Sequence, residues 1–299
     1  MNRKTLLIAT CALIVVGAVA VKISIGMGAI PVVKIGGESV EESQNRVRGN
    51  IDISEFDTLT IDASTVDVRI LEGDAYKLEY NVKEKYVPEV SQNGKNLTVK
   101  QPSLKPEIAF FDVDLTAFKE GESSYTITVP KDTAPINVDV KASTEDVVID
   151  GVDVNGKVVS DTDSVTLNNV SSSDFYVKSS TGKIKLDYSE FDKLELESST
   201  DDIIVENCTI NDLVAGSSSD KITLNNVKLN TADLKALDDI VIDIVGQNDY
   251  SLNLTSSTGE DIIVEGNTVE GSFKSDNGSG KSITAKSSTG EIKVSFANK

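Results

Sequence analysis

The chain has 299 residues, with 48 acidic and 29 basic side chains, no histidine and no tryptophan. The absence of histidine excludes Ser-His-Asp and Cys-His catalysis and the usual zinc sites that contain histidine. The net charge of −19 argues against nucleic-acid binding, because the Lys and Arg side chains that would neutralise phosphates are outnumbered.

An apolar segment near the amino terminus predicts a membrane anchor. Arg3 and Lys4 precede an uncharged, mainly apolar stretch at residues 5–21, which ends before Lys22. Positive charge ahead of such a stretch places the amino end in the cytoplasm and the rest of the chain outside. We therefore expect a single-pass protein of the cell membrane, with residues 1–34 as the cytoplasmic tip and transmembrane anchor and the C-terminal domain extracytoplasmic.

Two alternatives for this segment stay open. The stretch is at the short end for a spanning helix, and Ala18-Val19-Ala20 is a suitable signal-peptidase site, with cleavage after Ala20. Acylation of Cys11 would instead make a lipoprotein. Residues 35–49 are polar and glutamate-rich, as expected of a linker. Because residues 1–34 contain four basic residues and no acid, the exported part carries a charge of −23.

The β-repeat domain is expected at residues 50–299, with a wide insertion near its start. Alternating apolar residues at 59–70 form one copy of a strand pattern that recurs later in the chain. Residues from about 72 to 124 interrupt the pattern as an insertion or N-terminal β cap, in which Asn93-Gly94 suits a tight hairpin turn. We expect an irregular loop around Phe110 and Phe111 before the pattern resumes at 125–129.

A Ser-Thr turn then recurs at intervals of 18 to 20 residues, and this period defines the architecture. The turns fall at Thr144, Thr162, Thr181, Thr200, Ser219, Asp238, Thr258 and Asn277, and after a shortened step at Thr289. Each rung of about 19 residues supplies two short strands that cannot bury their own apolar face, so we predict an all-β solenoid, or β-helix, of stacked rungs. A leucine-rich repeat of similar length is disfavoured, because no L-x-x-L-x-L run accompanies the period.

Two offsets within the period predict how the rungs pack. Serine or alanine stands two residues before each turn, as a crowded corner requires. Asn169, Asn207 and Asn226 occupy the seventh position after their turns, where asparagine tolerates the left-handed conformation and can stack amide on amide. Tyr188 interrupts this ladder.

Cys208 is the only exported cysteine if Cys11 lies in the anchor, so no intramolecular disulfide is expected. Its rung offset is the same as that of Val170 and Val227. The pattern predicts a buried, inert thiol, and a reactive or intermolecular cysteine is the alternative.

Charged residues recur at the rung corner. Lys183, Asp202, Lys221 and Asp239 would alternate in sign along strands stacked about 4.8 Å apart, which predicts a structural charge ladder. The unbalanced acids Asp239, Glu260 and Asp261 are the candidates for a divalent-cation site, although the calcium-loop repeat is absent. We otherwise expect no metal, no cofactor and no catalytic residue.

The repeated Ser-Ser-Thr-Gly-[acid or Lys]-Ile-x-[Val/Leu] at 179–186, 256–264 (with one extra residue) and 287–294 resembles the bacterial putative-adhesin β-repeat domain of unknown function. The resemblance covers about residues 50–299. Members include LiaG-like membrane-anchored proteins of Gram-positive bacteria linked to cell-envelope stress, which implies adhesion or an envelope role and no catalytic residues. The chain departs from the pattern at Asp238-Asp239-Ile240 and at the shortened last step, where we expect irregular or capping rungs.

These features together predict a non-enzymatic, membrane-anchored solenoid that presents an acidic surface to an envelope protein or wall polymer. One alternative is a polysaccharide-active β-helix enzyme that uses paired carboxylates such as Asp201 and Asp202. Only 5% of the residues are aromatic, which leaves few rings for a sugar platform. The other alternative is a membrane-tethered regulatory sensor in which residues 5–21 take part in signalling.

Overall fold

The computed structural model describes residues 32–35, 46–103, 111–114 and 123–297. The predicted anchor at residues 5–21 lies outside them, and in the part that is described no helix has the length and apolar character to cross a membrane. The chain divides into two compact units. In the smaller one, β1 (Val32–Ile35) pairs antiparallel with β8 (Phe111–Asp114), so the loop expected around Phe111 contains a strand.

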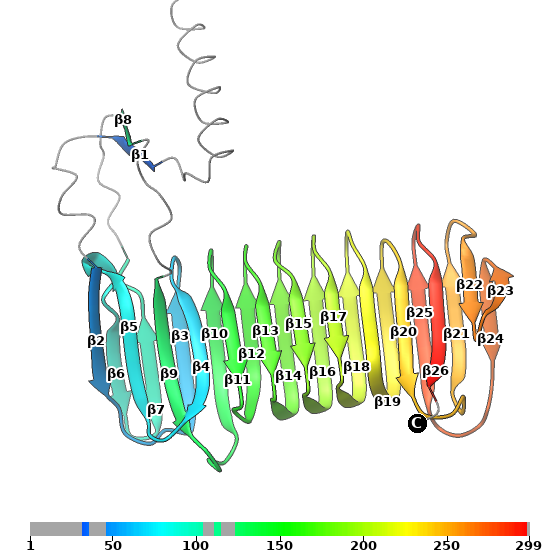
Figure 1. Ribbon diagram of the computed structural model, residues 1–299, viewed down its shortest axis with the longest axis horizontal. Helices are drawn as coiled ribbons and strands as arrows, with labels where there is room; N and C mark the ends of the chain where they lie inside the picture. The colour runs from blue at the N-terminus through cyan, green and yellow to red at the C-terminus, as the bar shows by residue number, and fades with distance from the viewer. Residues whose placement is uncertain (1–31, 36–45, 104–110, 115–122, 298–299) are drawn as a thin grey trace, which may run out of the picture. The chain divides into compact units, whose positions relative to one another are not determined.

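The larger unit consists of two layers of mostly parallel strands, called here the short-strand sheet and the long-strand sheet (Figure 1). In spatial order the short-strand sheet contains β2 (Arg46–Asp52), β5 (Lys77–Lys83), β9 (Ser124–Pro130), β4 (Asp67–Gly73), β11 (Val147–Asp150), β13 (Val165–Asn168), β15 (Ile184–Asp187), β17 (Ile203–Glu206), the first part of β19 (Ile222–Ala236), β20 (Ile240–Val245), β26 (Ile292–Ala297), β22 (Asp261–Val264) and β23 (Asn267–Glu270).

The long-strand sheet runs alongside in the same spatial order. It contains β6 (Glu89–Asn93), β7 (Asn96–Lys100), β3 (Thr58–Ala63), β10 (Ile136–Ala142), β12 (Val154–Ser160), β14 (Ser171–Ser179), β16 (Glu190–Ser198), β18 (Thr209–Ser217), the second part of β19, β25 (Ser282–Ser287), β21 (Ser251–Ser256) and β24 (Ser272–Ser275). Each coil of the solenoid gives one strand to each sheet, and β19 runs through both sheets. The predicted all-β fold of stacked rungs is confirmed.

Equivalent positions of successive coils pair in register through the middle of the stack. Val177 pairs with Leu196, and Leu196 pairs with Ala215 on the next coil. In the facing sheet, Ile184, Ile203 and Ile222 form a second inward column, and each of these side chains is fully buried. Burying one such side chain stabilises the fold by roughly 1.5–3 kcal/mol, but only stacked coils supply the neighbours that bury it.

At both ends of the stack the spatial order departs from the chain order. The coil of β3 and β4 lies between the coil of β7 and β9 and the coil of β10 and β11. Likewise the coil of β25 and β26, the last in the chain, lies between the coil of β19 and β20 and the coil of β21 and β22. The stacked rungs predicted from the period therefore follow the chain order in the middle of the solenoid but not at its ends.

This order also corrects the expected capping rungs. Asp238 and Thr289 both belong to internal coils, and Asn277 lies in the connection between β24 and β25 rather than at a coil turn. The ends contain antiparallel strands instead: β5 and β6 at one end, with β2 beyond β5, and β23 and β24 at the other. At the second end these edge strands have only four residues each, and short edges limit pairing with another chain.

Serine and threonine hydroxyls hold the turns together. Ser198 Oγ donates to the carbonyl oxygen of Asp201 at 2.6 Å within its own turn, and Thr200 Oγ1 donates to the carbonyl oxygen of Ser180 on the neighbouring coil at 2.8 Å. The serines two residues before the turns are buried at Ser160, Ser179, Ser198, Ser217, Ser256 and Ser287. The predicted requirement for a small side chain at this corner is confirmed.

Candidate interaction surface

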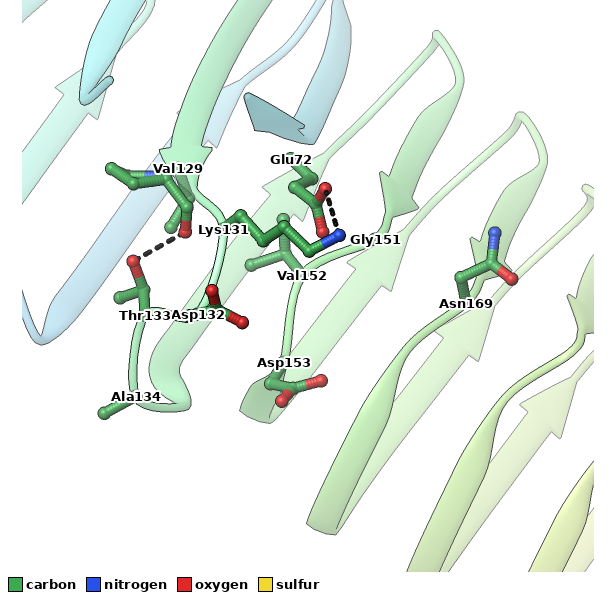
Figure 2. Close-up of a pocket in the computed structure, with 11 residues that line it drawn as sticks. Glu72, Val129, Lys131, Asp132, Thr133, Ala134, Gly151, Val152, Asp153 and Asn169 are labelled. Atoms are coloured by element: carbon green, nitrogen blue, oxygen red, sulfur yellow. Dashed lines mark hydrogen bonds and ion pairs between the residues drawn. The ribbon is translucent and has the colours of Figure 1, made fainter. Parts of the chain in front are cut away.

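A cavity of about 260 Å³ lies where the connection from β9 to β10 passes the ends of β4 and β11 (Figure 2). Its acids are Glu72, Asp132 and Asp153, and Lys131 Nζ lies 3.8 Å from Glu72 Oε1. The lining contains no aromatic ring. A cavity with carboxylates but without an aromatic stacking surface offers little to a polysaccharide.

The outer face of the short-strand sheet carries a continuous column of mainly β-branched side chains, called here the central column. In spatial order it contains Val148, Thr166, Lys185, Ile204, Thr223, Val241, Lys293 and Ile263, which neighbour one another in register. All of the uncharged members are half-buried. β-Branched side chains suit this pleated surface, and the stack holds them in a line across eight coils.

A second column, called here the corner column, runs beside the central one at the ends of the short strands. Its members are Asp150, Asn168, Asp187, Glu206, Asn225 and Asp243. Asn168 Nδ2 donates to Asp150 Oδ1 at 2.9 Å, and Lys185 Nζ of the central column lies 3.4 Å from Glu206 Oε2. Four of the six members are acidic, so this edge of the face is negatively charged.

The opposite edge, called here the turn column, contains the predicted charge ladder. Lys183 Nζ lies 3.1 Å from Asp202 Oδ2, and Lys221 Nζ lies 2.9 Å from Asp239 Oδ2 on the next coil. These contacts confirm two steps of the ladder. The hydrogen bond from Lys221 holds the pKa of Asp239 below its usual range, although partial burial works against this effect. The central, corner and turn columns together are called the short-strand face.

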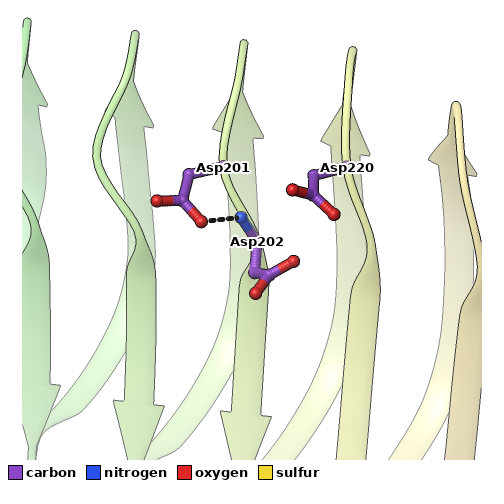
Figure 3. Close-up of side chains that lie close together, drawn as sticks. All are labelled: Asp201, Asp202 and Asp220. Carbon is purple, nitrogen blue, oxygen red and sulfur yellow. Dashed lines mark hydrogen bonds between the residues drawn. The ribbon is translucent and has the colours of Figure 1, made fainter.

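Three carboxylates gather at the turns beside the ladder (Figure 3). Oxygens of Asp201, Asp202 and Asp220 lie within 4.8 Å of one another, and Asp202 N donates to Asp201 Oδ1 at 2.7 Å. Partial burial, followed by the negative charge of Asp202, raises the pKa of Asp220. Asp220 follows Asp201 by one period, so the spacing could have identified it alongside the acids that the sequence singled out. Three oxygens are fewer ligands than a calcium ion takes.

The other predicted metal candidates are distributed over different coils. Asp239 precedes β20, whereas Glu260 and Asp261 lie at the start of β22, and both strands pair with β26 instead of with each other. Asp239 is also occupied by Lys221 and by the backbone amide of Glu291, which donates to Asp239 Oδ1 at 3.0 Å. The structure therefore does not place these three acids on adjacent coils.

The predicted asparagine ladder lies next to the corner column, and the structure confirms the left-handed backbone at its three asparagines and one amide-to-amide contact. Asn169, Asn207 and Asn226 have φ values of 49°, 52° and 56°, and Asn226 Nδ2 donates to Asn207 Oδ1 at 2.6 Å. Tyr188 shares the left-handed conformation, with φ of 47°, and its side chain is 64% exposed. The Tyr188 side chain has no amide to accept a hydrogen bond from the next coil, and Asn207 Nδ2 instead donates to Asp187 Oδ1 at 2.8 Å.

Cys208 is the described cysteine, and its side chain is buried as predicted. Its Sγ lies 3.0 Å from the carbonyl oxygen of Glu206, to which the thiol donates. Burial raises the pKa of the thiol to about 11. A protonated, enclosed thiol is a poor nucleophile, so Cys208 adds no chemistry to the short-strand face.

Comparison with known proteins identifies the family. Similar crystal structures include a putative adhesin from Bacteroides fragilis (17% identity, TM-score 0.42, 85% of this chain and 99% of that chain) and a putative adhesin from Parabacteroides distasonis (12%, 0.36, 83% and 97%). A third is a putative cell adhesion protein from Clostridium sporogenes (13%, 0.33, 85% and 100%). The curated proteins provide no match. The family model described as Toastrack DUF4097 matches residues 56–298, and the chain belongs to this family.

Proposed function

We propose that the protein is an exported, membrane-tethered β-solenoid that binds a protein or wall polymer of the cell envelope through its short-strand face and catalyses no reaction. The observation that carries the proposal is the register of this face. Half-buried Val, Thr and Ile side chains, interrupted by Lys185 and Lys293, form a line between two columns that contain many carboxylates. Partly apolar residues at the centre with a charged rim are the usual anatomy of a protein interaction site.

The stack makes this surface rigid before any partner arrives. The inner strands of the sheet use their backbone groups in parallel ladders on both sides, so a partner contacts side chains rather than adding a strand. Side chains held in line by the ladders lose little conformational freedom on binding. A preorganised row of this kind suits a partner that lies along the stack.

The amino-terminal sequence supports the tether. Residues 5–21 provide the apolar segment, and the exported part carries a charge of −23. The polar linker is shorter than the expected 35–49, because Ile35 belongs to β1 and residues 46–49 belong to β2. In this arrangement the linker presents the solenoid outside the membrane. Repulsion from anionic lipid headgroups would keep the acidic domain away from the bilayer surface.

Binding of full-length protein to isolated cell envelopes tests the proposal. The variants Ile204→Lys and Val241→Lys replace an apolar side chain of the central column with a further cation beside Lys185 or Lys293, and we expect each to weaken saturable binding about tenfold, the effect of losing roughly 1.4 kcal/mol. Val214→Lys is the matched control, because Val214 is 48% exposed on the outer face of the long-strand sheet. Equal binding by all three variants and the unmodified protein would contradict the assigned face.

The topology requires a separate measurement. Thr209 is exposed, so Thr209→Cys introduces an accessible thiol next to the buried Cys208. We expect a membrane-impermeant maleimide to label this variant in intact cells. Labelling that needs permeabilised cells would place the solenoid in the cytoplasm and overturn the export part of the proposal.

A further inference from the structure

Tyr188 occupies a position of the asparagine ladder at which the fold does not require a tyrosine. Its backbone φ of 47° is a conformation that asparagine tolerates and that a bulky residue rarely adopts. The same column contains asparagine at 169, 207 and 226. An aromatic residue in this conformation stores strain, and such strain is typical of positions kept for contact with a ligand.

The turn beneath Tyr188 is fixed on both sides. Ser189 Oγ donates to the carbonyl oxygen of Asp187 at 2.8 Å and accepts from Val170 N at 3.0 Å. Asp187 Oδ1 accepts from Asn207 Nδ2 on the next coil. The backbone that carries the ring is therefore held in place, while the ring itself is 64% exposed and takes part in none of the ring pairs found among the described residues.

The charged residues next to Tyr188 along the chain and on the next coil are mostly negative. Asp187 and Glu190 belong to the same coil as Tyr188, and Glu206 pairs in register with Asp187 from the next coil. Lys185 offsets one of these charges through its contact with Glu206. An exposed aromatic face among carboxylates attracts a cation through both the ring quadrupole and the surrounding charge.

We propose that Tyr188 is the anchor at which the short-strand face binds a cationic side chain, arginine or lysine, of an extended basic segment in a partner protein. This inference rests on the proposed function and names the chemistry of the partner. The cation lies over the Tyr188 ring, and the apolar or β-branched residues of the same segment lie along the central column. Tyrosine and arginine are both enriched among the residues that contribute most of the binding energy at protein interfaces.

A polysaccharide fits the same place less well. Sugar-binding surfaces use several exposed rings, and the other large apolar side chains exposed in the described part of the chain are Val214, Leu237 and Val269. Part of the hydrogen-bonding capacity of the amides next to Tyr188 is also used, because Asn169 Nδ2 donates to Asp150 Oδ1 at 3.2 Å and Asn207 Nδ2 to Asp187 Oδ1.

The test uses full-length protein and three short synthetic peptides. One alternates arginine with threonine, one replaces each arginine with uncharged citrulline, and one replaces it with glutamate. We expect the arginine peptide to bind with an affinity that falls as salt rises, and the other two to bind at least tenfold more weakly. A cell-wall glycan fragment serves as the competing class of ligand.

Two substitutions at one position separate binding from stability. Tyr188→Phe keeps the ring, and we expect it to bind the arginine peptide within about twofold of the unmodified protein. Tyr188→Asn restores the asparagine ladder, so we expect it to melt at the same or a higher temperature and to bind the peptide about five- to tenfold more weakly, the range of a cation–π contact. Tyr176→Phe on the long-strand sheet is the control for loss of an aromatic hydroxyl elsewhere.

Each outcome is decisive for the inference. Unchanged peptide affinity in Tyr188→Asn, or Tyr188-dependent binding of the glycan fragment in place of the peptide, would overturn it. Failure of the arginine peptide to bind the unmodified protein would overturn the assigned partner chemistry. In that case, sensitivity of envelope binding to Ile204→Lys would still support the proposed function, so the two failures are distinguishable.

Discussion

The hydroxyl of Thr289 donates a hydrogen bond of 2.7 Å to the carbonyl oxygen of Leu237, which lies 52 residues earlier in the chain. The backbone amide of Thr289 donates to the same oxygen. These contacts place the last coil of the chain against the coil of β19 and β20, while its other side pairs with β21 and β22. The last coil therefore completes the strand ladders of two neighbours at once.

Weakening this inserted coil should destabilise the coil beyond it. Ile292 is fully buried in β26, and we expect Ile292→Ala to lower the free energy of unfolding by about 2–5 kcal/mol because it leaves a cavity between two coils. Hydrogen exchange should accelerate at residues 251–275, which depend on β25 and β26, more than at residues 147–168. Lys293→Ala, at an exposed neighbour, is the control. Unchanged protection at 251–275 would show that the outer coil is held independently.

Two glycines provide a matched test of how closely the turns approach one another. A Cβ atom at Gly182 would lie 2.1 Å from the carbonyl oxygen of Asp163, whereas one at Gly216 would meet nothing within 4 Å. We expect Gly182→Ala to lower the melting temperature by several degrees, because the backbone of the adjacent coil must move. Gly216→Ala should leave stability unchanged or raise it by about 0.4–1 kcal/mol through the unfolded state. Equal melting temperatures for the two variants would argue against this close approach.

The sequence predicts the coils well and their order at the ends poorly. The period aligns Val177, Leu196 and Ala215 correctly, because each coil repeats the same alternation of inward and outward side chains. It cannot decide which coil lies beside which, since every coil presents nearly the same edge to its neighbour. The shortened step before Thr289 is the local sign of the insertion, because the intervening residues turn back as the antiparallel cap strands β23 and β24.

The pKa of Asp220 predicts a stability effect that depends on pH. Partial burial and the neighbouring carboxylate of Asp202 raise the folded-state pKa of Asp220, so the folded protein holds this proton more tightly than the unfolded chain. The resulting stabilisation is present below the ordinary aspartate pKa of about 3.9 and is lost as pH rises through the folded-state value. At pH 7 we expect Asp220→Asn to stabilise the protein by a few tenths of a kcal/mol to about 1 kcal/mol.

Denaturant unfolding at several pH values checks this prediction. Asparagine keeps an oxygen that can accept the hydrogen bond of 3.0 Å from Lys221 N, so the turn itself is preserved. The gain should vanish at acidic pH, where Asp220 is protonated. Asp62→Asn, at an exposed position on β3 away from the three-carboxylate group, should show no such gain. A destabilised Asp220→Asn at pH 7 would mean that the negative charge contributes a favourable contact.

Part of the proposed interaction surface could be predicted from the sequence. The alternating charges of Lys183, Asp202, Lys221 and Asp239 are visible in the spacing, and two of their contacts form. The central column is harder to find, because Val148, Ile204 and Val241 resemble core residues until the pleat shows that they point outward. Tyr188 is recognisable as an interruption of the ladder, but its left-handed backbone and its exposure require the structure.

Cys208 offers a direct measure of how often the middle of the solenoid opens. Burial raises the pKa of its thiol to about 11, so at neutral pH the group is both protonated and enclosed. We expect a maleimide reagent to modify Cys208 only through opening of the surrounding coils, and the labelling rate should rise with denaturant in parallel with unfolding. Thr209→Cys, one residue further at an exposed position, should be labelled at once under native conditions. Rapid labelling of Cys208 in the folded protein would mean that the coil around it opens readily, and the rigid stack on which the proposed surface depends would have to be reconsidered.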